Sequence, residues 1–448
     1  MSMWRISRFV FRSFSPRSSA AVSSVEAIDV GRVALCLALA LALTLPAPGR
    51  TDAIEIAALE SAARSGSPVL AAARARAREV LVLAEVAGLR GDPELALWVR
   101  NAFPTVTDTA DRPLAVEVEV VQPVRWPGKR DALEELAAAE TQAALYEVEV
   151  AEQQLVGELR RTFAELYSTD REQRALAESH ELLELLHATA RARFGDAQEG
   201  ALAVLEAELA KDEHDQDLDQ VFARFQAARA KLAALAGVGP EVLPLLVGEL
   251  PEPVFAVREG PLPFGPEAPS VRAAELRLEA ALRRLDAVRL GLKPDFGVGG
   301  GFLWPEGENA ELTVRFGMEL PFLRRRRLGP QVTAAESAVA AARADLAAAE
   351  VAGRAEAVRL GAERDRLERS LARLAGAIVP RTSVALDLAR SAFLNGEVPF
   401  PRLLELWYDW FHARTELTNA EAARYGVWAE SQALAGVPLA ALPPESRP

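Results

Sequence analysis

The chain has 448 residues, of which half are hydrophobic but only 6% are aromatic, and its formal net charge is −13. Residues 1–53 carry six arginines and three carboxylates, a net +3, so the rest of the chain carries −13 − 3 = −16. A negative charge of that size argues against nucleic acid as a partner. Cys36 is the single cysteine, so a chain without its N-terminal segment has neither a disulfide nor a thiolate site.

The N-terminal segment is typical of a secretory signal. Val33–Leu45 is an apolar run with a basic lead-in, and Pro46-Ala47-Pro48-Gly49 follows it. A run of this length is too short to cross a bilayer comfortably as a helix but suits the core of a signal peptide. We therefore expect residues 1–53 to be a signal peptide that is cleaved between residues 47 and 53. An N-terminal membrane anchor is the alternative.

The remaining chain is duplicated at an offset of 201 residues. Pro68, Pro93, Gly128 and Gly195 recur as Pro269, Pro294, Gly329 and Gly396. Because these residues start and stop helices and turns, their recurrence indicates one structural unit that is built twice. We expect repeats at residues 54–237 and 269–436, joined by a Pro/Gly-rich linker at 238–268 and followed by a flexible tail at 437–448.

Each repeat is predicted to begin with a helix, over residues 54–90 and 270–292, that a proline ends. The hydrophobic period then changes from 3.6 to 2, which indicates strands with one apolar and one polar face. The predicted strands span about 94–103 and 114–123 in the first repeat, and about 295–304 and 311–321 in the second.

A long helical hairpin follows each pair of strands. Helical patterns continue for about 64 residues after Gly128 and Gly329, on the order of 95 Å at 1.5 Å per residue. Pro380 is expected to kink the second of these helices. Gly195 and Gly396 allow a tight reversal, after which shorter helices return along the first.

The predicted strands are long enough to cross a bilayer when tilted. Four strands cannot close, and each unpaired backbone group at an open edge would cost several kcal/mol in lipid. Several protomers must therefore pool their strands, and three protomers supply twelve. The polar positions Glu117, Glu119, Arg315 and Glu319 would then face a water-filled lumen, and the apolar positions would face lipid.

The predicted fold class is thus mainly α with a small β part. Duplicated units of a helix, a β-hairpin and a long helical hairpin would form a trimeric twelve-stranded transmembrane β-barrel, continued by a periplasmic α-helical barrel. The pattern indicates a conduit.

No motif in the sequence indicates catalysis or a cofactor. His180 and His187 lie two helical turns apart with Glu184 between them, but no third ligand follows at metal spacing. The sequence contains no phosphate-binding loop, nucleophile elbow or catalytic triad. We expect neither an enzyme nor a bound metal or cofactor.

The order, spacing and duplication of four segments resemble the TolC-like outer-membrane efflux proteins. The segments are residues 63–90, Val121–Ala132, Met318–Ala335 and Ile378–Leu406. The resemblance covers about residues 54–436, and the stretch QPVRWPGKR looks most like the branch that serves heavy-metal and cation pumps.

The resemblance implies a homotrimer in outer-membrane lipid that extends into the periplasm and forms the exit duct of a tripartite efflux or secretion system. Its partners would be a periplasmic adaptor protein and an inner-membrane pump of the RND or ABC type. The family's adaptor-docking helical tips map onto Phe194, Gly195, Leu394, Asn395 and Gly396. Its pore constriction maps onto Arg402 and Glu405, where only one of two acids is retained.

Two other interpretations remain open from the sequence. A periplasmic adaptor (membrane fusion) protein also carries a long helical hairpin after a signal peptide, although it has one hairpin rather than two. A non-channel coiled-coil scaffold explains the helices but not the paired strands at matched positions.

Overall fold

The structure is a computed structural model, and it describes residues 54–100, 114–195, 201–245, 247–305, 307, 309–318 and 321–436. The predicted signal peptide and the predicted tail at 437–448 lie outside these residues, as do the turn region at 105–112 and Glu319. The described part is mainly helical and carries one small sheet. This agrees with the predicted fold class as far as a single chain can show it.

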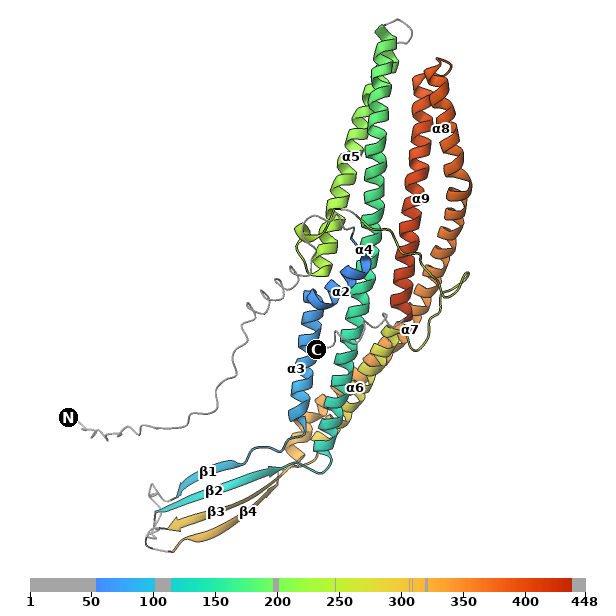
Figure 1. The fold of residues 1–448 in the computed structure, drawn as a ribbon. Coiled ribbons are helices and arrows are strands. Elements are labelled where there is room, and N and C mark those ends of the chain that lie inside the picture. The colour runs from blue at the N-terminus through green and yellow to red at the C-terminus, as the bar shows by residue number, and fades with distance from the viewer. Residues whose placement is uncertain are drawn as a thin grey trace, which may run out of the picture. The chain divides into compact units, whose positions relative to one another are not determined.

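The described residues of the first half form two short helices, two strands and two long helices (Figure 1). They are α2 (Ile56–Gly66), α3 (Pro68–Ala87), β1 (Glu94–Arg100), β2 (Ala115–Val124), α4 (Lys129–Gly195) and α5 (Ala201–Ala236). Pro68 starts α3 from the first helical position, where its missing N–H leaves no hydrogen bond unmade. Gly128, with φ of +83°, permits the turn into α4. The 67 residues of α4 correspond to about 100 Å.

The second half repeats this order, with one helix before its strands, after a connecting segment at residues 237–268. Its elements are η1 (Pro240–Val242), α6 (Pro269–Gly291), β3 (Phe296–Pro305), β4 (Glu311–Met318), α7 (Pro321–Arg373), η2 (Leu374–Ile378), α8 (Val379–Leu394) and α9 (Phe400–Ala435). The π-helical turn η2 lies directly before Pro380, where the sequence predicts a kink. Because proline has no N–H for the carbonyl of residue 376, the regular α-helical ladder is interrupted at this turn.

Several element boundaries differ from the sequence prediction, and two of the differences have a physical reason in the position of a proline. The long helix predicted after Gly329 already begins at Pro321 and contains Pro330. A proline at the first helical position favours this earlier start. The strand predicted to end at Pro123 continues to Val124. β1 reaches only Val121 on β2, so Pro123 lies where β2 pairs on one side and a missing N–H is tolerated.

The four strands form one antiparallel sheet in the order β1-β2-β3-β4. β2 and β3 belong to different halves of the chain, and they pair along their full lengths. The two hairpins are therefore one continuous sheet rather than two separate ribbons.

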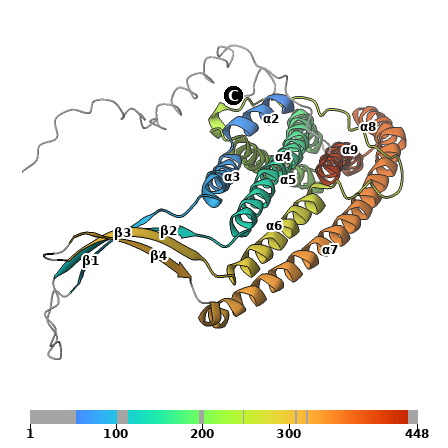
Figure 2. The ribbon, with the colours of Figure 1, turned by 90° about the horizontal axis from the view of Figure 1, so that it is seen from below.

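The helices pack side by side (Figure 2). α3, α4, α6 and α7 contact one another in that order, and α4 also packs against α5 and α9, with α8 against α9. No helix of the described residues combines the length and the apolarity that crossing a membrane requires. Most long helices thus have helical neighbours on two sides and keep other faces uncovered.

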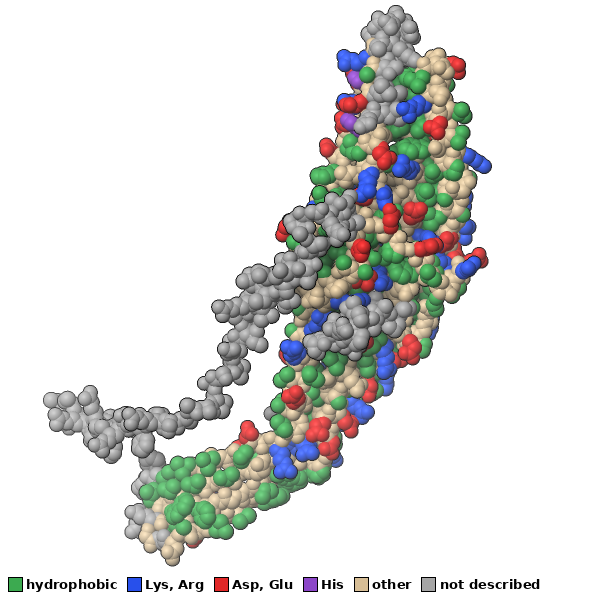
Figure 3. Space-filling view, in the orientation of Figure 1, with side chains coloured by type: hydrophobic (Ala, Val, Ile, Leu, Met, Phe, Trp, Pro, Cys, Tyr) green, Lys and Arg blue, Asp and Glu red, His purple; other side chains and the backbone are tan. Residues whose placement is uncertain are grey.

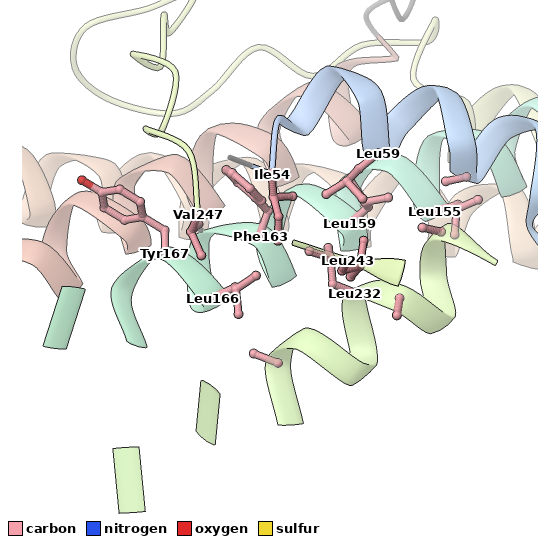
Figure 4. Packing of buried hydrophobic residues seen from close by; sticks show 14 of the residues in the cluster. Ile54, Leu59, Leu155, Leu159, Phe163, Leu166, Tyr167, Leu232, Leu243 and Val247 are labelled. Carbon is pink, nitrogen blue, oxygen red and sulfur yellow. The ribbon is translucent and has the colours of Figure 1, made fainter. Parts of the chain in front are cut away.

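The largest core lies where α2, α4 and α5 meet the segment that connects the two halves (Figure 4). Leu159, Phe163 and Leu166 of α4 are fully buried in it. Ile54 and Val247 join the same cluster and form a parallel β-bridge. The residues predicted as a Pro/Gly-rich linker therefore contribute buried side chains, which local composition does not reveal.

A second part of the connecting segment, residues 253–265, is bound to α7 by Arg364; we call these residues the strap. The Arg364 side chain is 1% exposed and donates hydrogen bonds to the carbonyl oxygens of Val257 and Gly260 at 2.5 and 2.7 Å. It also pairs with Asp365 at 2.6 Å. Gly361 permits this approach, because a Cβ there would lie 2.4 Å from the Gly260 carbonyl oxygen.

Candidate functional site

One face of the sheet is apolar along all four strands (Figure 3). The strand register places Leu97, Val118, Phe302 and Leu312 side by side on this face. Its exposed large side chains are Leu95, Leu97, Val99, Val120, Val124, Val298, Phe302, Trp304, Leu312, Val314, Phe316 and Met318. A contiguous apolar surface of this kind marks contact with a membrane or with another protein.

The opposite face carries the charged residues that the sequence predicts for a lumen. Glu117 and Glu119 are almost fully buried, and both contact Arg315: its Nη1 lies 2.9 Å from Glu119 Oε2, and its Nη2 lies 3.7 Å from Glu117 Oε1. Arg100 of β1 also pairs with Glu117. The sequence did not single out Arg100, because β1 has a weak strand pattern. The fourth predicted residue, Glu319, lies outside the described residues.

The sheet joins the helices through a polar cluster that links the two halves of the chain. Lys129 donates hydrogen bonds to Asp295 Oδ1 and to the Lys293 carbonyl oxygen, at 2.8 and 2.7 Å. The Trp126 backbone N–H donates to the same Asp295 oxygen at 2.9 Å, and the Trp126 ring stacks on Phe296 with the centroids 5.5 Å apart. The end of β2 and the start of β3 are thereby held together beside the first turn of α4.

The second helical tip is a tight turn stabilised by its backbone. The Gly396 N–H donates to the Phe393 carbonyl at 3.0 Å, and Gly396 has φ of +78°, which favours glycine. Asn395 caps α8, and Leu394 is 64% exposed. The predicted docking residues of this tip therefore lie together on an exposed turn.

The first helical tip is described only in part. Phe194 and Gly195 are the last two residues of α4, and the Phe194 side chain lies outside what the structure describes. The predicted reversal after Gly195 also lies outside the described residues.

Arg402 and Glu405 lie one turn apart near the start of α9. Arg402 Nη1 is 2.7 Å from Glu405 Oε2, and both side chains are exposed. Leu403, between them, is buried in a cluster with Phe393 and Phe400. The ion pair thus faces outward from its own hairpin, and its two charges offset each other.

The two helical hairpins are connected by a cluster of aromatic and histidine rings. The sequence did not predict this cluster. His214 of α5 is 2% exposed, stacks on His180 of α4 at 5.6 Å and meets the edge of Trp407 of α9 at 5.9 Å. Burial, and then the charge of His180, lower the pKa of His214. His187 is not in this stack. No three histidine or carboxylate side chains of the described residues are arranged to hold a metal ion.

The same contact includes a tyrosine on α9. The Tyr408 hydroxyl donates a hydrogen bond to Glu213 of α5 at 3.3 Å. Burial and the Glu213 carboxylate raise the pKa of Tyr408 to about 12, so the hydroxyl keeps its proton at neutral pH. The aromatic residues near position 408 therefore serve packing between hairpins.

Comparison with known proteins identifies a family model and a fold. Residues 266–437 match the family model of outer membrane efflux proteins. The outer-membrane channel OprN has a TM-score of 0.74 and 19% identity, over 85% of this chain and 90% of its own. The outer membrane protein VceC of Vibrio cholerae has a TM-score of 0.71 and 18% identity, over 85% of this chain and 96% of its own. The CmeC outer membrane channel of Campylobacter jejuni has a TM-score of 0.71 and 12% identity, over 85% of each chain.

No curated protein matches the sequence. The family model and the solved structures agree nevertheless, since the family match falls within a fold that outer-membrane channels share over most of this chain. The predicted resemblance to the TolC-like outer-membrane efflux proteins is therefore confirmed. The alternatives of a periplasmic adaptor or a coiled-coil scaffold are not favoured.

Proposed function

We propose that this chain, which carries an outer membrane efflux protein domain at residues 266–437, is the outer-membrane channel component of an efflux system and not an enzyme. It would be a passive exit duct that extends into the periplasm. The observation that carries this proposal is the two-faced sheet: one face exposes contiguous apolar side chains, and the other gathers paired charges. Such a sheet suits a wall between lipid and water.

A single protomer would leave this wall incomplete. Within the described residues, β1 and β4 each pair on one side only. Unpaired backbone groups are costly in lipid, so β4 of one protomer would pair with β1 of the next. A homotrimer would close twelve strands into a barrel, in which Glu117, Glu119, Arg315 and Glu319 line the lumen.

The helices would continue this barrel as an α-helical tube. Exposed apolar side chains on two separate helical surfaces support such an assembly. They are Leu205, Leu209 and Phe222 on α5, and Val351, Val358, Val384 and Leu388 on α7 and α8. In a ring of identical protomers, one surface of each chain would cover the other surface of its neighbour.

The partners we propose are a periplasmic adaptor protein and an inner-membrane pump of the RND or ABC type. The adaptor would dock on the tips at Phe194, Gly195, Leu394, Asn395 and Gly396. Docking can open the entrance only through a higher affinity for the open arrangement. Leu394, apolar and exposed beside the turn, is a suitable contact for an adaptor side chain.

Arg402 and Glu405 would line the constriction near the second tip. Because they form an ion pair, the ring would be less negative than one built from two acids. Single-channel conductance and selectivity of Arg402→Ala and Glu405→Ala test this assignment. Unchanged values in both variants would remove the pair from the pore.

The decisive experiment for the channel itself is a matched pair of neighbouring substitutions on β4. Val314 lies on the apolar face and is 80% exposed, whereas Thr313 lies on the polar face. A charge on the lipid side of a barrel strand opposes insertion, so Val314→Asp should lose outer-membrane localisation and the heat-sensitive trimer. Thr313→Asp should keep both. A wild-type protein that purifies as a stable monomer and never enters lipid vesicles would refute the proposal.

A further inference from the structure

Four charged side chains on the polar face form one network across the sheet. Arg100 of β1 pairs with Glu117 of β2, and Arg315 of β4 contacts both Glu117 and Glu119. Arg315 lies two strands away from these carboxylates, with β3 between them. Strands are about 4.8 Å apart, so the guanidinium reaches roughly 10 Å across its neighbour.

Glycines of β3 make this reach possible. Gly299 lies opposite Arg315 in the register, and Gly301 lies opposite Glu119. A Cβ on Gly299 would lie 2.9 Å from the Val120 carbonyl oxygen and 3.1 Å from Glu119 Oε1, and one on Gly301 would lie 2.3 Å from the Val118 carbonyl oxygen. At Gly299 a side chain would thus crowd the Glu119 carboxylate, and at Gly301 it would collide with the backbone of β2.

The two kinds of charge differ in exposure. The side chains of Glu117 and Glu119 are 2% exposed, whereas those of Arg100 and Arg315 are 53% and 47% exposed. The carboxylates therefore lie beneath the guanidinium groups, and the arginines present N–H donors outward. Glu94 and Glu311 are exposed carboxylates on the same face; the register places Glu94 in the row of Arg315 and Glu311 in the row of Glu117.

We propose that Arg100 and Arg315 set the charge preference of the pore wall, so that solutes passing along it are favoured when they carry anionic or hydrogen-bond-accepting groups such as carboxylate or phosphate. This inference rests on the proposed function, because it requires that the polar face lines a lumen. Each pair sums to zero net charge, but a solute meets the guanidinium first. Arginine suits this role since its planar donors match carboxylate and phosphate oxygens. Free cations would gain nothing from the buried carboxylates.

The test is the reversal potential of the trimer in a planar bilayer under a KCl gradient. The fourfold variant R100Q/E117Q/E119Q/R315Q removes the pairs without leaving a buried charge alone, and its reversal potential is expected to shift toward cations relative to the wild type, because exposed Glu94 and Glu311 remain. R100K/R315K, which keeps both positive charges, is expected to keep the wild-type potential. As a matched control, the helical pair Arg283 and Glu135, whose charged atoms are 2.8 Å apart, is replaced by two glutamines and should leave the potential unchanged.

Two results would overturn the inference and are distinguishable. A conducting wild type whose reversal potential equals that of the fourfold variant removes the arginines from selectivity while leaving the channel function intact. A wild type that conducts no current refutes the proposed function and this inference with it. A shift toward cations in the fourfold variant, with the lysine variant like the wild type, supports the assignment.

Discussion

The attachment of the strap to α7 depends on Arg364, and replacing this residue by methionine should release the strap. Methionine fills much of the same volume but donates no hydrogen bond to the carbonyl oxygens of Val257 and Gly260. A hydrogen bond from a charged donor contributes about 1.5–3 kcal/mol. Val257 is 39% exposed, so water can reach part of the freed backbone, and the lower value applies. Two such bonds give a loss of about 3 kcal/mol. The Asp365 pair adds little, because that carboxylate is partly exposed.

Native-state hydrogen exchange measures this loss where it occurs. The Leu262 N–H donates to the Ala357 carbonyl of α7 at 3.1 Å, so its exchange reports opening of the strap. A change of about 3 kcal/mol should accelerate that exchange by about 10²-fold. Arg366→Met is the matched control, since Arg366 lies on the same helix but pairs with Glu363 in solvent. Equal Leu262 exchange in Arg364→Met and the wild type would refute the reasoning.

Three further predictions concern other parts of the molecule. The lowered pKa of His214 disfavours its charged form in the folded protein, so the contact between α5 and α9 should weaken as the pH falls below the pKa of an unfolded histidine, about 6.5. His214→Phe should remove this pH dependence of the thermal midpoint, and a variant with the wild-type pH profile would contradict the prediction. Gly301→Val should prevent β2–β3 pairing and trimer formation, because its Cβ would lie 2.3 Å from the Val118 carbonyl oxygen. Gly300→Val should assemble normally, because its Cβ would lie 3.6 Å from its nearest neighbour, the Thr313 carbonyl oxygen. Phe163→Ala should destabilise the core by about 3–5 kcal/mol and lower the thermal midpoint, whereas Val242→Ala, at an exposed side chain, should not. Equal thermal midpoints for the two variants would place Phe163 outside the core.

Local sequence signals were sufficient for the order of elements. Pro68 and Pro269 each stand at the first position of a helix, and Gly396 takes the positive φ that a tight reversal needs. Strict alternation along residues 114–121 and 312–318 predicted strands, and the register puts their apolar residues on one face. These features depend on a residue and its near neighbours, so one sequence contains them.

Contacts between distant segments were not predictable in the same way. His180, His214 and Trp407 meet because three helices pack together, and no spacing in the sequence relates them. The strap has no hydrophobic period, so its attachment through Arg364 leaves no pattern. Arg100 stands at the end of β1, and only the pairing of β1 with β2 brings it to Glu117.

The charge network on the polar face of the sheet depends on residues that differ between the two halves. At the 201-residue offset, Trp98 and Arg100 of β1 correspond to Gly299 and Gly301 of β3. A copy of Trp98 at position 299 would fill the space over which Arg315 reaches Glu119. The second strands differ in offset by three residues, and Glu117 then corresponds to Arg315, which carries the opposite charge. Two identical halves would place carboxylates on both β2 and β4, and copies of Trp98 and Arg100 on β3 between them, so the present pairing of Arg315 with Glu119 across glycines could not form. The network therefore requires that the duplicated strands keep their backbone pattern while their inward side chains diverge.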